Sequence, residues 1–237
     1  EEDFSFRESD LHGLAVFSLL DDAGNSARLP FGVAFVRQAA RGAAERAGLR
    51  AGDRILAING EPLRDVIDFH FNAGEARLTC AVEREGARAS VVVERRGADL
   101  GLELLPPTPS EISTCANKCV FCFIHQLPRG MRKSLYVKDD DYRLSFLHGN
   151  YITLTDLEEP ELERIETQRL SPLYVSVHAT DPELRHALLG RPRVRRELLP
   201  VMERLAKAGI AMHAQIVLCP DWNDGPHLDR TVHELAR

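Results

Sequence analysis

Three cysteines fall within eight residues of this chain, and their spacing limits what that stretch can fold into. Cys115, Cys119 and Cys122 form the pattern C-x3-C-x2-C, whereas Cys80 and Cys219 lie far away in the sequence. Three clustered thiols cannot all pair with one another as disulfides, because one is always left over. They can instead bind three corners of an iron–sulfur cubane, which usually takes four thiolates. The fourth iron would then be open to a small molecule, which a catalytic metal needs and a structural metal lacks.

Two other interpretations share this spacing. His125 follows Cys122 after two further residues, so the three cysteines and His125 can also make a closed Cys3His zinc site. The thiols can also be without any ligand. The spacing favours an iron–sulfur cluster over zinc, and zinc over free thiols.

The cysteine pattern resembles the signature of the radical S-adenosylmethionine (radical SAM) enzymes. Phe121 occupies the position directly before the last cysteine, where those enzymes carry an aromatic residue. The resemblance implies that the three thiolates hold a [4Fe-4S] cluster whose fourth iron is chelated by the amino and carboxylate groups of SAM. It also implies that one electron from the cluster cleaves SAM, and that a 5′-deoxyadenosyl radical abstracts hydrogen from the substrate. In such enzymes the protein supplies binding, orientation and exclusion of water.

Length and composition suit a cytoplasmic protein with one large core or two small ones. The chain has 237 residues, of which 44% are hydrophobic, and a formal net charge of −6. No basic tail or stripe is present, so bulk charge does not favour nucleic-acid binding, although it does not exclude it. The sequence shows no signal peptide and no apolar run of about 18 residues, so we expect no membrane span. Its five cysteines suit a reducing cytosol rather than a disulfide framework.

We predict four segments along the chain. Residues 1–29 have no assigned role, and residues 30–103 form a small domain. Residues 104–110 form a linker, because their three prolines make it stiff and extended. Residues 111–237 form the core that carries the clustered cysteines. Since the chain does not begin with Met and ends inside a predicted helix, we expect a fragment whose core is truncated at the C-terminus.

Residues 30–103 resemble a PDZ domain, a small β-rich fold with alternating strand and turn signals. The most specific stretch runs from Ala47 to Gly60, and its last two residues, Asn59-Gly60, predict a tight turn with positive φ. The resemblance implies that an extended peptide C-terminus is added to the sheet as a strand, with its carboxylate held near residues 30–33. A purely structural or docking role for the domain is the alternative.

Residues 111–237 alternate strand and helix signals. The predicted strands are apolar, which argues for a parallel α/β sheet. These strands are 144–146, 151–154, 173–178 and 212–218. The predicted helices are 156–168, a helix that begins at Asp181-Pro182, and 197–208.

Five stretches of this half resemble the DUF512 family, which consists of PDZ-containing radical SAM proteins of uncharacterised substrate. These stretches are 126–132, 138–146, 149–155, 171–185 and 215–220. The resemblance covers roughly residues 31–237. It implies a partial parallel (β/α) barrel of radical SAM type, whose first strand precedes the cysteine loop, and a further region C-terminal to this chain. It also implies an electron donor such as flavodoxin or ferredoxin.

The resemblance also assigns candidate site residues at the ends of strands, where sites form in parallel α/β folds. The metal ligands would be Cys115, Cys119 and Cys122. The cofactor-binding residues would be Gly149, Asn150, Ser176, His178 and Gln215, with Asn223 beside Gln215 in the upper cavity. A plain turn at Gly149-Asn150 and a buried core histidine at His178 are the alternatives. Cys219 is expected to be a buried thiol rather than a fourth ligand.

We therefore predict a radical SAM enzyme that cleaves SAM reductively and abstracts hydrogen from an unknown substrate. Its PDZ-like module would dock a protein partner, which favours a peptide or protein as substrate. One alternative is a non-catalytic zinc- or iron–sulfur-bearing PDZ interaction protein. A further alternative is a radical SAM enzyme that modifies RNA.

Overall fold

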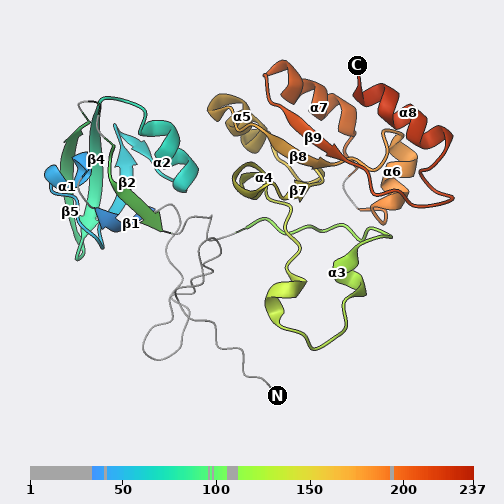
Figure 1. The fold of residues 1–237 in the computed structure, drawn as a ribbon, viewed down its shortest axis with the longest axis horizontal. Helices are drawn as coiled ribbons and strands as arrows, with labels where there is room; N and C mark the ends of the chain where they lie inside the picture. Colours follow the sequence, from blue (N-terminus) through green and yellow to red (C-terminus); the bar gives the residue numbers. More distant parts are fainter. Residues whose placement is uncertain (1–33, 40–41, 96, 98, 106–111, 193–194) are drawn as a thin grey trace. The chain divides into compact units, whose positions relative to one another are not determined.

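The computed structural model describes residues 34–39, 42–95, 97, 99–105, 112–192 and 195–237. The chain divides into two compact units, Glu1–Ser110 and Glu111–Arg237. Figure 1 shows that strands dominate the first unit, whereas helices and strands alternate in the second. The predicted segment 1–29, the predicted carboxylate-binding stretch 30–33 and most of the predicted linker lie outside the described residues.

The described part of the first unit is an antiparallel sheet with two short helices. The strand order is β5-β4-β2-β1-β6, and β3 pairs with β2. The strands are β1 (Ala34–Ala39), β2 (Arg54–Ile58), β3 (Glu61–Pro62), β4 (Arg77–Arg84), β5 (Ala87–Glu94) and β6 (Leu102–Leu105). The helices are α1 (Ala43–Arg46) and α2 (Val66–Asn72).

Two tight turns join neighbouring strands of this sheet. Asn59 and Gly60 have φ values of 52° and 90° and connect β2 to β3. Glu85 and Gly86 have φ values of 50° and 80° and connect β4 to β5. Two consecutive residues with positive φ are typical of type I′ turns, whose twist matches that of paired strands. The turn predicted at Asn59-Gly60 is confirmed.

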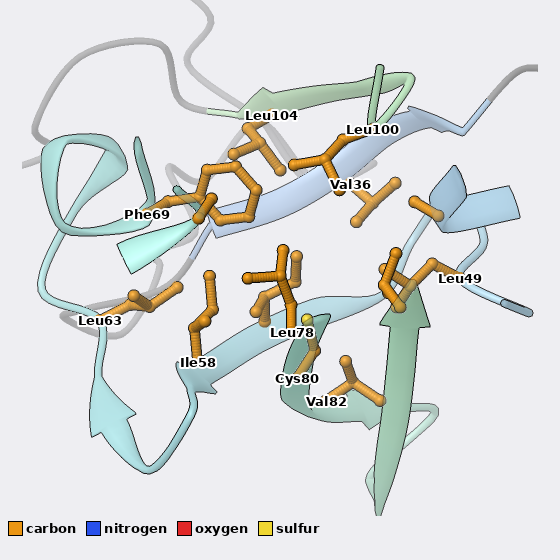
Figure 2. Packing of buried hydrophobic residues seen from close by; sticks show 14 of the residues in the cluster. Val36, Leu49, Ile58, Leu63, Phe69, Leu78, Cys80, Val82, Leu100 and Leu104 are labelled. Carbon is orange, nitrogen blue, oxygen red and sulfur yellow. The ribbon is translucent and has the colours of Figure 1, made fainter. Parts of the chain in front are cut away.

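The core of the first unit lies on one face of the sheet, as Figure 2 shows. Along β4, Leu78, Cys80 and Val82 are buried, while the residues between them are more exposed. This alternation is the period of two that a half-buried strand requires. Phe69 of α2 belongs to the same cluster of buried side chains. Burial raises the pKa of the Cys80 thiol to about 11, so this cysteine is a core residue rather than a reactive one.

Gly42 allows α1 to approach the loop that precedes β6. The Ala43 N–H donates to the Asp99 carbonyl and the Ala44 N–H to the Leu100 carbonyl, each at 3.1 Å. A Cβ atom on Gly42 would lie 2.1 Å from the Leu100 carbonyl oxygen, which is far inside van der Waals contact. Only glycine therefore fits between α1 and this loop.

The described part of the second unit is a parallel α/β structure. β7 (Tyr151–Ile152), β8 (Leu173–Ser176) and β9 (Met212–Gln215) form a parallel sheet in that order. The helices are α3 (Phe123–Gln126), α4 (Tyr142–His148), α5 (Glu159–Gln168), α6 (Pro182–Leu188), α7 (Leu198–Lys207) and α8 (Pro226–Leu235), with a 3-10 helix at Lys133–Tyr136. Helices lie in both crossovers between the strands, as parallel pairing requires.

The predicted parallel sheet is confirmed, but these three strands do not define a barrel. Among the described helices, none has the length and apolar character needed to cross a lipid bilayer.

One predicted strand is a helix in the structure. Residues 144–146 lie inside α4. Asp141 caps this helix by accepting a hydrogen bond from the Arg143 N–H at 2.9 Å, and Gly149 ends it with φ 77°. A short apolar run does not distinguish a buried strand from a buried helix segment. The polar cap and the C-terminal glycine decide between them.

Several predicted boundaries also move. β7 ends at Ile152 rather than at residue 154, and β8 ends at Ser176 rather than at residue 178. α5 begins at Glu159 rather than at residue 156, because the Glu161 side chain accepts from the Glu158 N–H and a proline occupies the first turn. β9 ends at Gln215 rather than at residue 218. Beyond it, the Val217 N–H donates to the ring of His178 instead of continuing the ladder.

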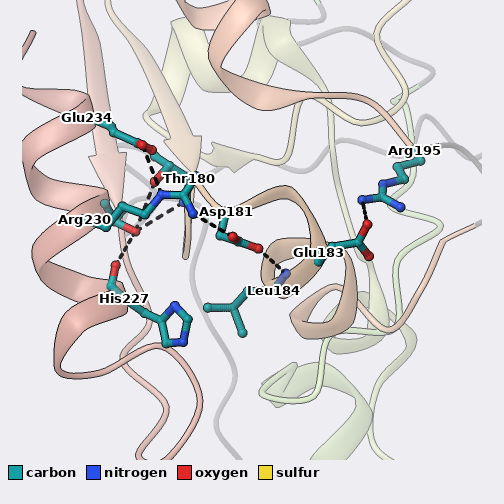
Figure 3. Close-up of polar contacts among 9 residues, drawn as sticks. Thr180, Asp181, Glu183, Leu184, Arg195, His227, Arg230 and Glu234 are labelled. Carbon is teal, nitrogen blue, oxygen red and sulfur yellow. Dashed lines mark hydrogen bonds and ion pairs between the residues drawn. The ribbon is translucent and has the colours of Figure 1, made fainter.

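Asp181 joins the start of α6 to α8, as Figure 3 shows. Its Oδ1 accepts from the first turn of α6 at 2.9 Å, and its Oδ2 accepts from Arg230 at 2.7 Å. The buried Thr180 N–H also donates to the hydroxyl of Thr231 on α8 at 3.2 Å. The helix start predicted at Asp181-Pro182 is confirmed. These contacts attach the chain that follows β8 to the last described helix.

Candidate metal centre

The three clustered cysteines lie on a loop with two fixed ends. At its start, the Cys115 N–H donates to the Lys138 carbonyl at 2.7 Å. At its end, Cys122 is the N-cap residue of α3, and its N–H donates to the Cys119 carbonyl at 3.1 Å. All three thiols are half-buried. The loop therefore turns back on itself.

The end of α6 holds the middle of this cysteine loop. The Lys118 N–H donates to the Leu189 carbonyl and the Val120 N–H to the Leu188 carbonyl, each at 3.0 Å. Gly190, with φ 76°, lies against the loop so closely that a Cβ atom there would fall 2.1 Å from the Lys118 carbonyl oxygen. The loop is thus attached by its backbone, which leaves the cysteine side chains available for a ligand.

Cys115 and Cys122 lie close enough to Cys119 to influence its pKa. Burial, together with these two cysteines, raises the pKa of Cys119 to about 11. Burial and the carboxylate of Asp140 raise the pKa of Cys115, while Lys138 opposes the rise at both Cys115 and Cys119. Bare thiolates are therefore disfavoured here, and a bound metal would supply the positive charge that stabilises them.

Thiolates are the donors that iron–sulfur clusters take, so the chemistry of the three cysteines fits such a group. Over the described residues, no three His, Cys, Asp or Glu side chains form a group able to hold one metal ion. His125, the possible fourth zinc ligand, is exposed, and its Nε2 lies 3.2 Å from the Lys138 ammonium. The structure does not gather it with the three thiols.

Asn117 connects the cysteine loop to the chain that follows β7. It is 1% exposed, and its Nδ2 lies 3.1 Å from the hydroxyls of both Thr153 and Thr155. Asp140 accepts from the backbone and the hydroxyl of Thr153. The Oδ1 of Asn117 is buried without a hydrogen-bond partner. A buried acceptor without a partner is uncommon in folded proteins, and a ligand or water at this site would satisfy it.

Arg185 joins the carboxyl ends of β7 and β8. Its guanidinium donates to the carbonyls of Thr153 at 2.7 Å, Ser176 at 3.0 Å and Val177 at 3.0 Å. The side chain is 5% exposed, and burial lowers its pKa to about 10, against the opposing influence of Asp140 and Cys119. Three carbonyl partners satisfy this buried cation. Arg185 therefore determines the shape of the sheet edge next to the cysteines.

His178 follows β8 and lies against the cysteine loop. Its ring and that of Phe121 have centroids 4.5 Å apart, and its side chain is buried. Its Nδ1 accepts from the Val217 N–H at 3.2 Å, so the ring proton is on Nε2. Burial lowers the pKa of His178 to about 4. Its backbone has φ 64°, an uncommon conformation for histidine, and Asn223 donates to its carbonyl at 2.7 Å.

Ser176 and Gln215 are direct neighbours at the carboxyl ends of β8 and β9. Directly opposed residues project from the same face of a sheet. Ser176 is buried and Gln215 is half-buried. The Gln215 carbonyl accepts from the N–H groups of Val177 and His178 at 2.9 and 3.2 Å. The structure thus brings Ser176, His178 and Gln215 together at one edge.

Gly149 and Asn150 lie elsewhere. They precede β7, so they lie at its amino end, whereas Ser176 and Gln215 lie at carboxyl ends. Gly149 ends α4, and a Cβ atom there would lie 3.3 Å from the ring of Tyr174. Asn150 donates to Asp139 at 2.8 Å. The structure does not join this pair to the other predicted cofactor-binding residues, and their cofactor role is still only a prediction.

Among the described residues, the hydrogen bonds of Cys219 are made with residues near it in the sequence and not with the cysteine loop. Cys219 was predicted to be buried but is half-buried. Its thiol donates to the Val217 carbonyl at 3.7 Å, and its N–H donates to Asn223 at 2.7 Å. Asn223 is 1% exposed and uses its amide to close the loop after β9.

Two family models match parts of the chain. A family model described as a radical SAM-like domain matches residues 94–237, and a PDZ domain model matches residues 35–71. The first match covers more than half of the chain, so the chain belongs to the radical SAM-like domain family. The predicted pairing of a PDZ domain with a radical SAM domain is confirmed at this level, and it supports an enzyme of the radical SAM superfamily.

Curated relatives match only a short part of the chain. The regulator of sigma-E protease RseP from Salmonella typhimurium (strain 14028s / SGSC 2262) is 37% identical over 71 residues, which cover 30% of this chain and 14% of that protein. The regulator of sigma E protease from Salmonella typhi matches equally. The chain thus spans about a seventh of the length of these relatives. The solved PDZ domain of the SdrC-like protein from Listeria monocytogenes is 13% identical, covers 33% of this chain and 94% of that one, and gives a TM-score of 0.28.

Proposed function

We propose that this chain is a radical SAM enzyme of the DUF512 type, with a [4Fe-4S] cluster on Cys115, Cys119 and Cys122. The observation that carries the proposal is the cysteine loop itself. Three half-buried thiols lie on a loop that the end of α6 holds by its backbone, and two of them raise the pKa of the third, Cys119. A partial parallel (β/α) barrel, of which β7, β8 and β9 would be part, completes the proposed fold.

The chain's own residues would hold and orient the cofactors. When bound, the cluster supplies one electron for cleavage of the sulfonium C–S bond of SAM, which starts hydrogen abstraction from the substrate. Arg185 keeps the carboxyl ends of β7 and β8 together by binding three carbonyls. His178 packs on Phe121 and presents a neutral ring. These contacts give the site a fixed shape and keep water from its inner wall.

SAM would bind along the carboxyl ends of the parallel strands. Ser176, His178 and Gln215 lie there together, and ligands of parallel α/β folds bind at this edge. The serine hydroxyl, the histidine Nε2–H and the glutamine amide can all form hydrogen bonds with a ribose or an amino-acid group.

The PDZ domain would dock a peptide or protein, either the substrate or a partner. β6 ends the strand order of the described sheet, and PDZ domains add a peptide strand at a sheet edge. Gly101, with φ 68°, directly precedes β6. The predicted carboxylate-binding stretch 30–33 lies outside the described residues. The electron donor would be a flavodoxin or a ferredoxin, and the site of action the cytoplasm.

The deciding experiment is anaerobic reconstitution with iron and sulfide, followed by metal analysis and EPR of the reduced protein with and without SAM. About four irons per chain, and a spectrum that changes when SAM is added, would support the proposal. A triple Cys→Ser variant of Cys115, Cys119 and Cys122 is the control and should bind no iron. One tightly bound zinc without iron would instead favour a zinc-bearing PDZ interaction protein.

A further inference from the structure

Lys138 is the cation built into the cysteine loop. Its Nζ donates to the Asn117 carbonyl at 2.6 Å, so the ammonium lies against the backbone between Cys115 and Cys119. Its own carbonyl accepts the Cys115 N–H at 2.7 Å. The side chain is half-buried, and therefore less screened by water than a surface lysine. Both ends of Lys138 thus contact the loop that carries the thiols.

The other charges near the thiols are already committed to partners. Asp140 is 9% exposed and accepts two hydrogen bonds from Thr153. Arg185 is buried and donates to three carbonyls. The Lys138 ammonium has one carbonyl and the exposed His125 ring as partners. No carboxylate forms an ion pair with it in the described part of the chain, so its charge is not neutralised locally.

We propose that Lys138 raises the reduction potential of the [4Fe-4S] cluster by placing an unneutralised positive charge beside two of its ligands. The inference rests on the proposed function, because it needs the cluster. Reduction by dithionite adds one electron and no proton, so the cluster becomes more negative by one charge. An ammonium beside the ligands stabilises that reduced form more than the oxidised one. Charge and hydrogen bonding near the sulfurs are among the factors that set such potentials.

The test is an EPR-monitored redox titration of the reconstituted full chain without SAM. Lys138→Gln keeps a hydrogen-bond donor for the Asn117 carbonyl and removes the charge. Lys138→Arg keeps the charge. Lys118→Gln is the matched control, because Lys118 lies in the same loop with an exposed side chain. Iron content is measured for each variant, and signals are compared per bound cluster.

We expect Lys138→Gln to lower the ratio of reduced to oxidised cluster by about tenfold at a fixed ambient potential, which is about 59 mV for a one-electron couple. Lys138→Arg should stay close to the unchanged protein, and Lys118→Gln should shift much less than Lys138→Gln. Lys138→Met, which removes both the charge and the hydrogen bond, should shift at least as far as Lys138→Gln.

Three results would overturn the inference while leaving the enzyme proposal intact. One is an unchanged potential in Lys138→Gln, and another is an equal shift in Lys138→Arg, which would assign the effect to geometry instead of charge. The third is loss of the cluster from both neutral variants, which would assign Lys138 to cluster assembly. Absence of iron from the unchanged protein is distinguishable from all three, since it would overturn the proposed function and this inference together.

Discussion

The ring of His178 packs against the ring of Phe121, with centroids 4.5 Å apart and planes inclined by 56°. Phe121 belongs to the cysteine loop, whereas His178 directly follows Val177 at the end of β8. This contact therefore couples the loop that would hold the cluster to the sheet edge that would hold SAM. Because His178 is buried and accepts from the Val217 N–H, it also fixes the chain beyond β9.

The neutral state of His178 predicts a pH dependence of stability. Burial, and then the charge of Arg185, lower its pKa to about 4, whereas an unfolded histidine has a pKa of about 6.5. Between these values the unfolded state binds more protons, so the contribution of His178 is complete above about pH 6.5 and is lost as the pH falls to about 4. The loss amounts to roughly 3 kcal/mol.

Chemical denaturation of the apo protein between pH 7 and pH 4 measures this loss. His178→Asn removes the titrating ring and suits a backbone with positive φ, so its stability should change less over this range. His148→Asn, at an exposed histidine of α4, is the control and should follow the unchanged protein. The assignment to His178 would be wrong if both variants kept the same pH slope.

The stability of the second unit is predicted to depend on the shape of the Arg185 side chain as well as on its charge. Arg185→Lys keeps the positive charge, but an ammonium cannot reach three carbonyls in the way a planar guanidinium does. Since a hydrogen bond to a charged group contributes about 1.5–3 kcal/mol, both Arg185→Lys and Arg185→Met should lower the free energy of unfolding by about 3 kcal/mol. Arg204→Met, which removes ion pairs to Glu159 and Glu166 on α5, should lower it much less. Urea unfolding measures all three, and full stability of Arg185→Lys would contradict the argument.

Local signals explain why part of the fold could be predicted from the sequence. The three cysteines, the Asn59-Gly60 turn and the Asp181-Pro182 helix start are each defined by adjacent residues, whose preferences do not depend on distant contacts. The parallel sheet followed from apolar runs separated by helices. The error at residues 144–146 arose because three residues are too few to distinguish the period of a strand from that of a helix, although Asp141 and Gly149 were available as helix signals.

The residues that shape the site could not be found in this way. Arg185 binds a carbonyl 32 positions away, and Asn117 binds hydroxyls 36 and 38 positions away. Arginine and asparagine are common on protein surfaces, so the sequence alone does not mark Arg185 or Asn117 as a buried residue of the site. Gly149 and Asn150 were assigned a cofactor role through the family resemblance; they precede β7, and that role is still a prediction.

The stability of the PDZ domain is predicted to depend on the close approach of Gly42 to the backbone of the loop before β6. In Gly42→Ala, the new Cβ would meet the Leu100 carbonyl oxygen at 2.1 Å, and backbone atoms cannot move aside without disturbing β6. Overpacking of this kind costs about 1–3 kcal/mol. Gly74→Ala is the control, because its Cβ would meet nothing closer than 3.9 Å. Thermal unfolding should show a lower midpoint for Gly42→Ala only, and equal midpoints would show that the loop before β6 can adjust.

The position of the cysteine loop is predicted to depend on the close approach of Gly190, at the end of α6, to the Lys118 carbonyl. Gly190→Ala carries two penalties, since φ is 76° and the Cβ would meet the Lys118 carbonyl oxygen at 2.1 Å. Gly130→Ala, in the same unit, carries only the first, because φ is 89° and nothing lies within 4 Å. A positive φ costs an alanine about 1–2 kcal/mol, so the two variants separate backbone strain from displacement of the loop.

Iron bound per chain after reconstitution is the measurement that distinguishes these two effects. Gly130→Ala should bind as much iron as the unchanged protein, because its strain lies away from the contacts between α6 and the loop. Gly190→Ala should bind clearly less, because displacing the Lys118 carbonyl breaks the backbone bonds that position Cys119. If Gly190→Ala bound iron fully, the thiols would gather without the support of α6, and the metal would have to organise the loop by itself.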